Sequence, residues 1–518
     1  MNFKKQSALF RTFLGTVPFA RFARPDRGDV AIIVTPWAQT AVPWYSIAMA
    51  LLYRERGWNA TLVWDDLPSP SPRDLPTDLK IIESALDSLD GKLPVIPLST
   101  VAPVELDAED QAEIVRLTNL NMISYLKAVP DPRPEPEIEA HCLATLDQAL
   151  QRIRGLLVTN RYDHLLIPGG IYGKSGLYLH AGRRNGVRVA CFDSGAGSMT
   201  IGVDNVAGYC MDLAKMFLDP RFTDFVHANK DRALELGRKE FELRTQGRDR
   251  YTYQSHAYRE HDDLEGGDVL IPMSVFDDAA GLGRNLLFPL PEDWLRETIE
   301  FLLRETNATV VVREHPNAWR MKRGTHLRGF LESGFVNEPR FRFVGGDQKI
   351  STYNLLEKAQ VVLPCASTVG VEAAALGKAV IVESSVYYGN LSFVQKAVSK
   401  TDYFERIRNS LANPEPLADE QREQAWLCYF FGQVANFVDC DFTPQPVDFN
   451  QWAQRPFAEL SQDPKVRLIV DAFSLGIPSC RLQSELILTK HPGSFQRKRL
   501  WRKLCEGVSS LTNFCRSN

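Results

Sequence analysis

Two short stretches in the second half of the sequence combine residue types that can bind an anion. In one of them, Ser367 and Thr368 follow the apolar run Val361-Val-Leu-Pro364 and precede an alanine-rich stretch that includes Gly370 and ends at Gly377. A strand followed by a helix start places hydroxyl groups beside free backbone N–H groups at the positive end of the helix dipole. The pattern predicts a phosphate and sugar-hydroxyl site, and plain N-capping by the two hydroxyls is the alternative.

Glu372 follows in the same alanine-rich stretch and supplies a carboxylate that could bind sugar hydroxyls. A capping box places its acid three residues after the capping hydroxyl. Glu372 lies five residues after Ser367 and four after Thr368, so the spacing does not fit such a box. We therefore predict that Glu372 faces a ligand.

The other stretch is Arg313-Glu-His-Pro316, which follows the β-branched run Val310-Val-Val312. The run is typical of a buried strand, and Pro316 ends it. Ligands of open α/β sheets bind outside the carboxyl ends of the strands, so we expect Arg313, Glu314 and His315 to meet a ligand there. As an imidazolium, His315 could stabilise or protonate a leaving phosphate, whereas a satisfied structural histidine is the alternative.

In the first half of the sequence, Cys191-Phe-Asp-Ser-Gly-Ala-Gly197 places Asp193 at the end of a predicted strand, before a glycine-rich loop. A carboxylate there could accept the proton of an incoming hydroxyl as a general base. An aspartate that forms a turn with its own backbone is the alternative, and Asp204 and Asp212 are nearby competitors. The glycine loop at 168–174 matches neither Gly-x-Gly-x-x-Gly nor a P-loop, so it is weak evidence for a dinucleotide or for ATP.

Apolar β-rich runs alternate with helical patterns along the sequence, and this alternation predicts parallel sheets. These sheets would position the residues named above. The predicted fold class is α/β, with two Rossmann-like parallel-sheet domains that face a cleft and a helical C-terminal extension. We expect a basic N-terminal arm at 1–27, a first domain at 28–265, a second domain at 266–410, and the extension with a basic tail at 411–518.

Composition excludes several classes of protein. The chain of 518 residues is 44% hydrophobic and 24% charged, which is ordinary for a globular protein. Its 60 Lys and Arg against 64 Asp and Glu give a net charge of -4, so no global basic field would attract nucleic acid. The 9 cysteines form no Cys-x-x-Cys pair, which favours reduced thiols in the cytoplasm. Metal-ligand spacing is missing, and Asp439-Cys-Asp441 is short enough to arise by chance, so we predict no metal site.

Both ends of the chain are basic and amphipathic. The segment 1–24 carries cations before the first acid at Asp26, and the segment 490–503 carries cations without an acid. The N-terminal segment could form an interfacial amphipathic arm or a helix that packs on the body of the protein. No run approaches the roughly 18 apolar residues that cross a bilayer, so we expect a cytoplasmic protein whose basic ends allow peripheral contact with the inner face of the plasma membrane.

Three motifs together resemble a known family. Arg-Glu-His-Pro at 313–316, Ser-Thr-Val-Gly-Val-Glu-Ala at 367–373 and Gly-Lys-Ala-Val at 377–380 resemble bacterial capsule polysaccharide biosynthesis proteins. Those proteins are related to Kdo-transferase-type and sialyltransferase-type glycosyltransferases of the GT-B fold. The run from Leu270 to Asp278 also resembles the start of their nucleotide-sugar domain.

The resemblance implies a GT-B-like fold in which the first domain is the acceptor side and the second binds a CMP- or UDP-linked sugar, without a metal or another cofactor. It implies catalytic roles for Asp193, as the acceptor-side base, and for His315, on the phosphate. The nucleotide-sugar site would be formed by Arg313, Glu314, Ser367, Thr368, Gly370 and Glu372, with the two hydroxyls on the phosphate and Glu372 on the ribose.

The leading hypothesis is a glycosyltransferase that moves a sugar from a nucleotide-sugar to a surface, capsular-type polysaccharide or to a lipid-linked acceptor. A nucleotide-sugar epimerase is one alternative, and it would convert the donor without an acceptor. A non-catalytic, transferase-like scaffold of a polysaccharide assembly complex is another, and it would bind no nucleotide-sugar.

Overall fold

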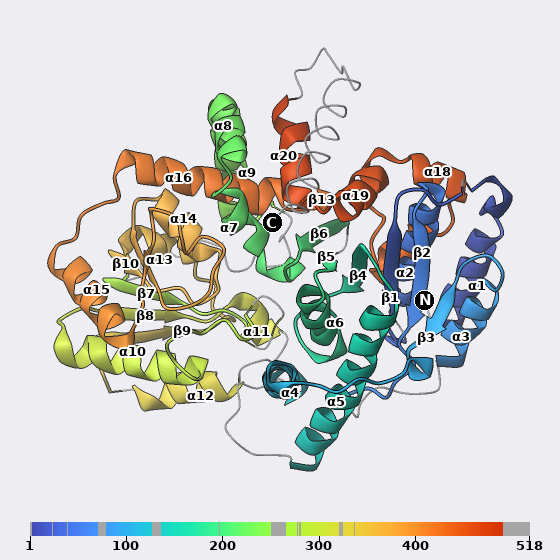
Figure 1. The fold of residues 1–518 in the computed structure, drawn as a ribbon. Helices are drawn as coiled ribbons and strands as arrows, with labels where there is room; N and C mark the ends of the chain where they lie inside the picture. The colour runs from blue at the N-terminus through green and yellow to red at the C-terminus, as the bar shows by residue number, and fades with distance from the viewer. Residues whose placement is uncertain are drawn as a thin grey trace.

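The computed structural model contains two α/β domains, each built on its own sheet (Figure 1). It describes residues 3–22, 24–38, 40–70, 79–126, 136–195, 197–249, 266–276, 278, 281–320, 325–335 and 337–489. The basic stretch at 490–503 lies outside these residues. No helix in the described part of the chain is long and apolar enough to span a membrane.

The sheet of the first domain has seven strands in the order β13-β6-β5-β4-β1-β2-β3. Its strands are β1 (Asp29–Val34), β2 (Asn59–Trp64), β3 (Val95–Pro97), β4 (His164–Pro168), β5 (Arg188–Gly195), β6 (Ser198–Val203) and β13 (Val438–Asp439). The first five are parallel, as predicted, but β6 and β13 pair antiparallel at one edge. The alternation of side chains along a strand sends Val30 and Ile32 of β1 into one core and Ala31 and Ile33 into the other.

Helices cover both faces of this sheet. One core includes residues of α1 (Phe3–Leu14), α2 (Val42–Glu55) and α3 (Leu79–Asp87), and the other includes residues of α4 (Ala108–Leu126), α5 (Pro136–Thr159) and α6 (Gly173–Arg184). Of the two alternatives for the N-terminal segment, the structure shows the packed helix. Phe10 and Phe13 of α1 are buried against Trp44 and Trp452.

The sheet of the second domain has six parallel strands in the order β12-β11-β10-β7-β8-β9. They are β7 (Val269–Pro272), β8 (Val310–Arg313), β9 (Phe341–Val344), β10 (Val361–Val362), β11 (Ala379–Val382) and β12 (Gln395–Lys396). The helices of this domain are α10 (Pro291–Glu305), α11 (Pro316–Arg320), α12 (Thr325–Gly334), α13 (Thr352–Lys358), α14 (Val369–Ala375) and α15 (Lys400–Ala412). The apolar runs that begin at Val310 and Val361 form β8 and β10, as predicted.

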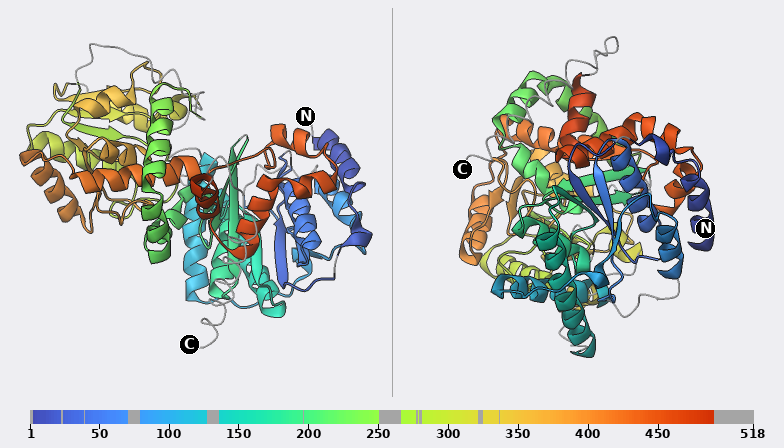
Figure 2. Two further views of the ribbon diagram at one scale, coloured as in Figure 1. Left: turned by 90° about the horizontal axis from the view of Figure 1, so that it is seen from above. Right: turned by 45° about the vertical axis from the view of Figure 1, so that its right-hand side comes forward.

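The chain passes between the domains twice. It leaves the first domain through α7 (Met211–Met216), α8 (Pro220–Ala228) and α9 (Lys230–Thr245), and it returns through α16 (Asp419–Tyr429) and the π-helical turn Phe430–Ala435. Figure 2 shows α16 extending from the second domain toward the first. Phe222 of α8 packs on Phe431 of the returning turn, so the two crossings share a core.

The residues from 411 onward do not form a separate extension. Within the described part of the chain, α16 packs on α14 and α9 beside the second domain. The chain then adds β13 to the first sheet and covers the first domain with α17 (Pro446–Trp452), α18 (Phe457–Gln462) and α19 (Pro464–Leu475), followed by α20 (Ser479–Thr489). The aromatic residues of α17 and α18 complete a core whose other half lies near the N-terminus.

We expect Trp452→Ala to lower the free energy of unfolding of the first domain by about 3–5 kcal/mol, as measured by chemical denaturation. The indole is fully buried, packs on Phe13 and Phe442, and donates a hydrogen bond of 2.9 Å from Nε1 to the carbonyl of Thr443. The control Val158→Ala, at an exposed position of α5, should change stability by less than about 0.5 kcal/mol. Equal small effects of the two variants would contradict the shared core.

Candidate functional site

The carboxyl edge of the second sheet gathers most of the residues predicted to bind a donor. His315 follows β8, the Ser367–Thr368 turn follows β10, and Glu372 lies in the first turn of α14. Arg244, at the end of α9, has its Nε 3.9 Å from a carboxylate oxygen of Glu372, and its charge also contributes to the lowered pKa of His315. The structure thus brings together residues that are far apart in the sequence.

His315 is neutral and has a fixed tautomer in this arrangement. Burial, together with the neighbouring charges of Arg244 and Arg313, lowers its pKa to about 4. Its Nδ1 accepts a hydrogen bond of 3.1 Å from the backbone N–H of Asn317, so the ring proton is carried by Nε2. The imidazolium expected from the sequence therefore does not fit the unliganded protein. A neutral imidazole can still donate a hydrogen bond from Nε2.

Arg313 and Glu314 bind the loop that follows β9. The sequence predicts ligand contacts for them instead. Arg313 is only 2% exposed, and its guanidinium donates to the carbonyls of Gly345 and Ile350. Glu314 accepts a hydrogen bond of 2.6 Å from the backbone N–H of Gly346. A buried charge needs partners within the protein, and both side chains find them in this loop. They therefore stabilise the edge of the sheet.

A buried tyrosine stabilises the Ser367–Thr368 turn. Tyr388 donates a hydrogen bond of 2.6 Å from its hydroxyl to the carbonyl of Ser367. A Cβ at Gly370 would lie 2.4 Å from that hydroxyl oxygen, so the glycine is required for the close approach. The Ser367 hydroxyl accepts a hydrogen bond of 3.3 Å from the backbone N–H of Val369, which is the N-capping alternative, and both hydroxyl residues stay partly exposed.

Glu372 does not face an open ligand site, contrary to the prediction. It is 1% exposed and accepts a hydrogen bond of 3.2 Å from the hydroxyl of Tyr353, with Arg244 Nε at 3.9 Å from its other oxygen. Burial raises its pKa, and Arg244 and Tyr353 oppose that shift. The α14 helix turns this carboxylate inward, toward α9 and α13, which the offset from the two hydroxyls could not indicate.

No motif in the sequence indicated Arg244, whose Nη1 also pairs with Asp249 at 2.9 Å. Arg244 lies at the end of a charged helix that has few buried residues. The only signal was its place just before the second domain.

On the first sheet, Asp193 lies within a hairpin and not before a free loop. β5 continues to Gly195 and pairs antiparallel with β6, so Asp193 is opposite Thr200. Gly197 has a φ of 70°, which allows a tight turn between the two strands. The glycine pattern predicts a longer loop at this point. The parallel pairing of β4 with β5 ends where Pro168 lies opposite Phe192, and Asp193 is the next residue. It is therefore at the carboxyl edge of the parallel strands.

Asp193 lies close to a contact between the two domains. A Cβ at Gly208 would lie 3.3 Å from Asp193 Oδ2, and the hydroxyl of the neighbouring Tyr209 donates to the carbonyl of Leu282, between β7 and α10, at 2.5 Å. Burial raises the pKa of Asp193, the N–H of Ser194 opposes that shift, and the charge of Asp278 adds to it. Asp278 belongs to the loop that follows β7. The competitors are used inside the first domain: Asp204 accepts from the N–H of Val189, and Asp212 accepts from the N–H of Val203.

Two exposed aromatic residues lie at the same edge of the first sheet. Trp37 follows β1, and Tyr172 precedes α6 in the glycine loop after β4. A Cβ at Gly169 would lie 3.9 Å from the Trp37 ring, and the N–H of Gly169 donates to the carbonyl of Phe192, next to Asp193. Lys174 of this loop is buried in an ion pair with Asp65 at 2.6 Å, which is a structural contact.

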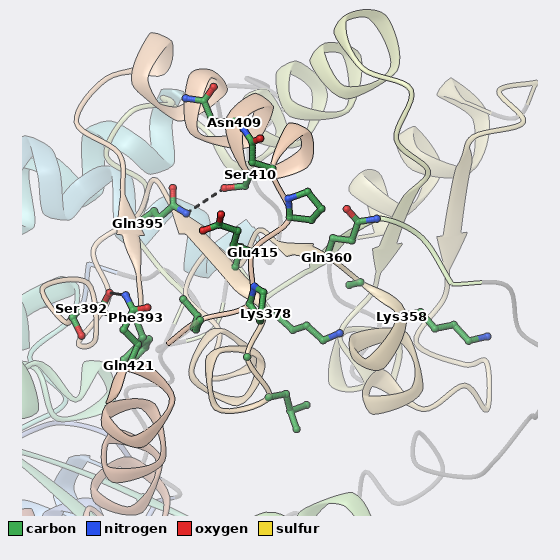
Figure 3. A pocket seen from close by; sticks show the side chains of 18 residues that line it. Lys358, Gln360, Lys378, Ser392, Phe393, Gln395, Asn409, Ser410, Glu415 and Gln421 are labelled. Atoms are coloured by element: carbon green, nitrogen blue, oxygen red, sulfur yellow. Dashed lines mark hydrogen bonds between the residues drawn. The ribbon is translucent and has the colours of Figure 1, made fainter. Parts of the chain in front are cut away.

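The remaining candidate sites are a metal site and a pocket. The described residues include no group of three or more metal-ligating side chains. Asp441, part of the Asp-Cys-Asp motif, pairs with Arg455 at 3.2 Å. A pocket of about 660 Å³ lies at the opposite edge of the second sheet, beside Gln360 before β10 and Lys378 before β11 (Figure 3). The amides of Gln360, Gln395 and Gln421 in its lining are hydrogen-bonded within the protein, as in the 3.2 Å contact between Gln395 and Ser410.

Comparison with known proteins gives structural likenesses only. No protein-family profile matches the chain, and no curated protein sequence matches it. Similar solved structures include KpsC, a β-Kdo 2,7-transferase of Thermosulfurimonas dismutans, which has 15% identity, covers 54% of this chain and 80% of its own, and has a TM-score of 0.31. A glycosyltransferase of Rickettsia africae has 10% identity, covers 85% of this chain and 100% of its own, and has a TM-score of 0.29.

A UDP-GlcNAc 2-epimerase of Neisseria meningitidis bound to UDP-GlcNAc has 11% identity, covers 77% of this chain and 94% of its own, and has a TM-score of 0.24. The KpsC transferase is of the Kdo-transferase type that the sequence resemblance names, and the epimerase is of the class named as one alternative. Because the TM-scores are low, the assignment of two parallel-sheet α/β domains rests on the strands and connections of this chain.

The site makes a prediction for His315 that follows from its lowered pKa. An unfolded chain binds the imidazole proton near pH 6.5, whereas the folded protein binds it only near pH 4, so folding stability should fall as the pH drops from 6.5 to 4. NMR titration of isotope-labelled histidines should show two resonances with a pKa of about 4, because burial also lowers the pKa of His164 to about 4. One of them should disappear in His315→Gln and the other in His164→Gln. A His315 pKa above 6 would contradict this environment.

Proposed function

We propose that this protein is a nucleotide-sugar-dependent glycosyltransferase. The observation that carries the proposal is that chemistry-bearing residues at the carboxyl edges of both sheets meet at one junction. Asp193 of the first sheet lies beside Gly208, and the next residue, Tyr209, donates a hydrogen bond to Leu282 in the loop that leaves β7 of the second. Groups that can bind an anion come from the second domain, and a carboxylate that can accept a proton comes from the first. Such a division fits a reaction between two substrates.

The donor side of the proposal uses the turn after β10 and the imidazole after β8. The partly exposed hydroxyls of Ser367 and Thr368 can donate to phosphate oxygens. The Nε2–H of neutral His315 can do the same, because its Nδ1 is occupied by Asn317. Phosphate is the anion that such donors suit, so a CMP- or UDP-linked sugar is the proposed donor.

In the proposed step, an acceptor hydroxyl gives its proton to the Asp193 carboxylate, and its oxygen forms a bond to the anomeric carbon of the sugar. The bond from that carbon to the phosphate oxygen breaks, and its electron pair leaves with the nucleotide. Burial raises the pKa of Asp193, with a smaller contribution from Asp278, and a raised pKa makes the carboxylate a better proton acceptor. The residues named here act by positioning the substrates and by stabilising charge.

The acceptor side of the proposal is the edge of the first sheet. Trp37 and Tyr172 are exposed there, and aromatic rings offer apolar faces to the C–H groups of sugars. The proposed acceptor is therefore a glycan, either a capsular-type polysaccharide or a lipid-linked chain. Contact of the basic chain ends with the inner face of the plasma membrane remains part of this proposal.

We expect Asp193→Asn to lower turnover by about 100- to 10,000-fold, because the amide cannot accept the proton of the acceptor hydroxyl. Affinity for the nucleotide should stay within about twofold, because the second domain binds the donor. The measurement is transfer from UDP- and CMP-sugars to a panel of capsular-type oligosaccharides, together with calorimetry of donor binding. Asp87→Asn, at an exposed position of α3, is the control and should transfer like the wild type.

The same assay separates the alternatives. An epimerase would convert the nucleotide-sugar without any oligosaccharide, and a scaffold would show no heat of binding with any donor. Donor conversion without an acceptor, or unchanged turnover of Asp193→Asn, would contradict the proposed function.

A further inference from the structure

Arg284 has a buried guanidinium that lacks a carboxylate partner within the described part of the chain. The residue is 4% exposed. Its guanidinium lies 4.0 Å from the centroid of the Tyr209 ring, and Nη2 lies 3.4 Å from the sulfur of Met211, while Nε has no hydrogen-bond partner among the described residues. A thioether and an aromatic face are weak partners for a charge, and a buried charge without a strong partner is costly.

Another buried arginine of the second domain, Arg313, has backbone acceptors for its guanidinium that Arg284 does not have among the described residues. Arg313 is buried to a similar depth and donates to backbone carbonyls of the loop after β9. Glu383 is a buried acid that contacts the loop containing Arg284. It accepts hydrogen bonds from the backbone N–H groups of Leu286 and Leu287 at 3.1 Å each. Glu383 therefore positions the loop and leaves the charge of Arg284 to another partner.

Both domains hold the loop around Arg284 in place. Leu282 is buried in the core of the first domain, and a Cβ at Gly283 would lie 2.8 Å from the Leu120 side chain of α4. On the other side, the N–H of Ser385 donates to the carbonyl of Arg284 at 2.8 Å. A guanidinium fixed in this way is preorganised at the junction.

The surroundings of Arg284 connect it to the proposed donor site. The thiol of Cys365, two residues before Ser367, lies 3.9 Å from Oδ1 of Asn285, the residue that follows Arg284, and Tyr388 donates to the carbonyl of Ser367. On the side of the first domain, the Arg284 guanidinium lies over the ring of Tyr209, and a Cβ at the neighbouring Gly208 would lie 3.3 Å from Asp193 Oδ2. Arg284 thus lies between the Ser367 turn and the proposed base.

We propose that Arg284 binds the phosphate groups of the nucleotide donor and stabilises the charge on the departing nucleotide. This inference rests on the proposed function and adds the residue that carries the positive charge. When the bond between the anomeric carbon and the phosphate oxygen breaks, the electron pair stays on that oxygen, and the planar guanidinium can donate two hydrogen bonds to the phosphate. Such charge-assisted bonds replace the contacts with Tyr209 and Met211.

The test compares Arg284→Met with Arg313→Met in calorimetry and thermal unfolding. The probes are UDP, CMP, uridine, cytidine and inorganic pyrophosphate. We expect Arg284→Met to weaken binding of the preferred nucleotide by about 10- to 100-fold and to leave nucleoside binding unchanged. Without ligand, Arg284→Met should melt no lower than the wild type, because it removes an uncompensated buried charge, whereas Arg313→Met should melt several degrees lower. Arg284→Lys, which keeps the charge and loses the planar fork, should bind with intermediate affinity.

The outcomes separate this inference from the proposed function. Unchanged nucleotide affinity of Arg284→Met, or a melting temperature as low as that of Arg313→Met, would overturn the inference and leave the proposed function in place. Binding of pyrophosphate but of no nucleotide by the wild type, lost in Arg284→Met, would support the anion site and contradict the nucleotide-sugar donor. Absence of binding of every probe by the wild type would overturn both.

Discussion

The loop from Leu282 to Leu287 is the constraint on which the arrangement of the two domains depends. Its first residues pack into the first domain, where Leu282 is buried and the hydroxyl of Tyr209 donates to the Leu282 carbonyl at 2.5 Å. Its last residues are held in the second domain by the carboxylate of Glu383. The carboxyl edges of both sheets are joined through this loop, and a reaction that needs groups from both edges requires such a joint.

The distribution of charge at the junction indicates which groups are structural and which are open to a ligand. Arg244 is balanced by Asp249 and Glu372. Glu314 has a cation beside it in Arg328 at 3.3 Å. Arg284 has no such counterpart among the described residues. The region beside Arg284 therefore carries a buried positive charge that a bound anion can neutralise.

The sequence predicted the second domain well and the site in part. β-branched runs that end at Pro316 and Pro364 indicate strands by local pattern alone, and His315 and Ser367 follow from them because carboxyl ends of parallel strands share an edge. Glu372 was predicted to face a ligand, but tertiary packing of α14 against α9 turns it toward Arg244. Spacing along one helix does not reveal a partner from a distant helix.

The remaining differences have similar causes. β6 was missed because the glycines of the β5–β6 hairpin were taken for a loop, and β13 is a two-residue strand that only pairing with β6 defines. The return of residues beyond 411 to the first domain depends on aromatic contacts such as that between Phe10 and Trp452, which join the two ends of the chain. Arg284 could not be singled out because its importance lies in the partners that it lacks.

The most direct measurement of the central claim is a crystal structure of the full chain with UDP or CMP bound. The account predicts phosphate oxygens within hydrogen-bond distance of the Arg284 guanidinium and the Ser367–Thr368 turn, with His315 Nε2 beside them and the sugar side directed toward Asp193. A nucleotide bound elsewhere, such as at the pocket beside Gln360 and Lys378, with Arg284 still against Tyr209, would contradict it.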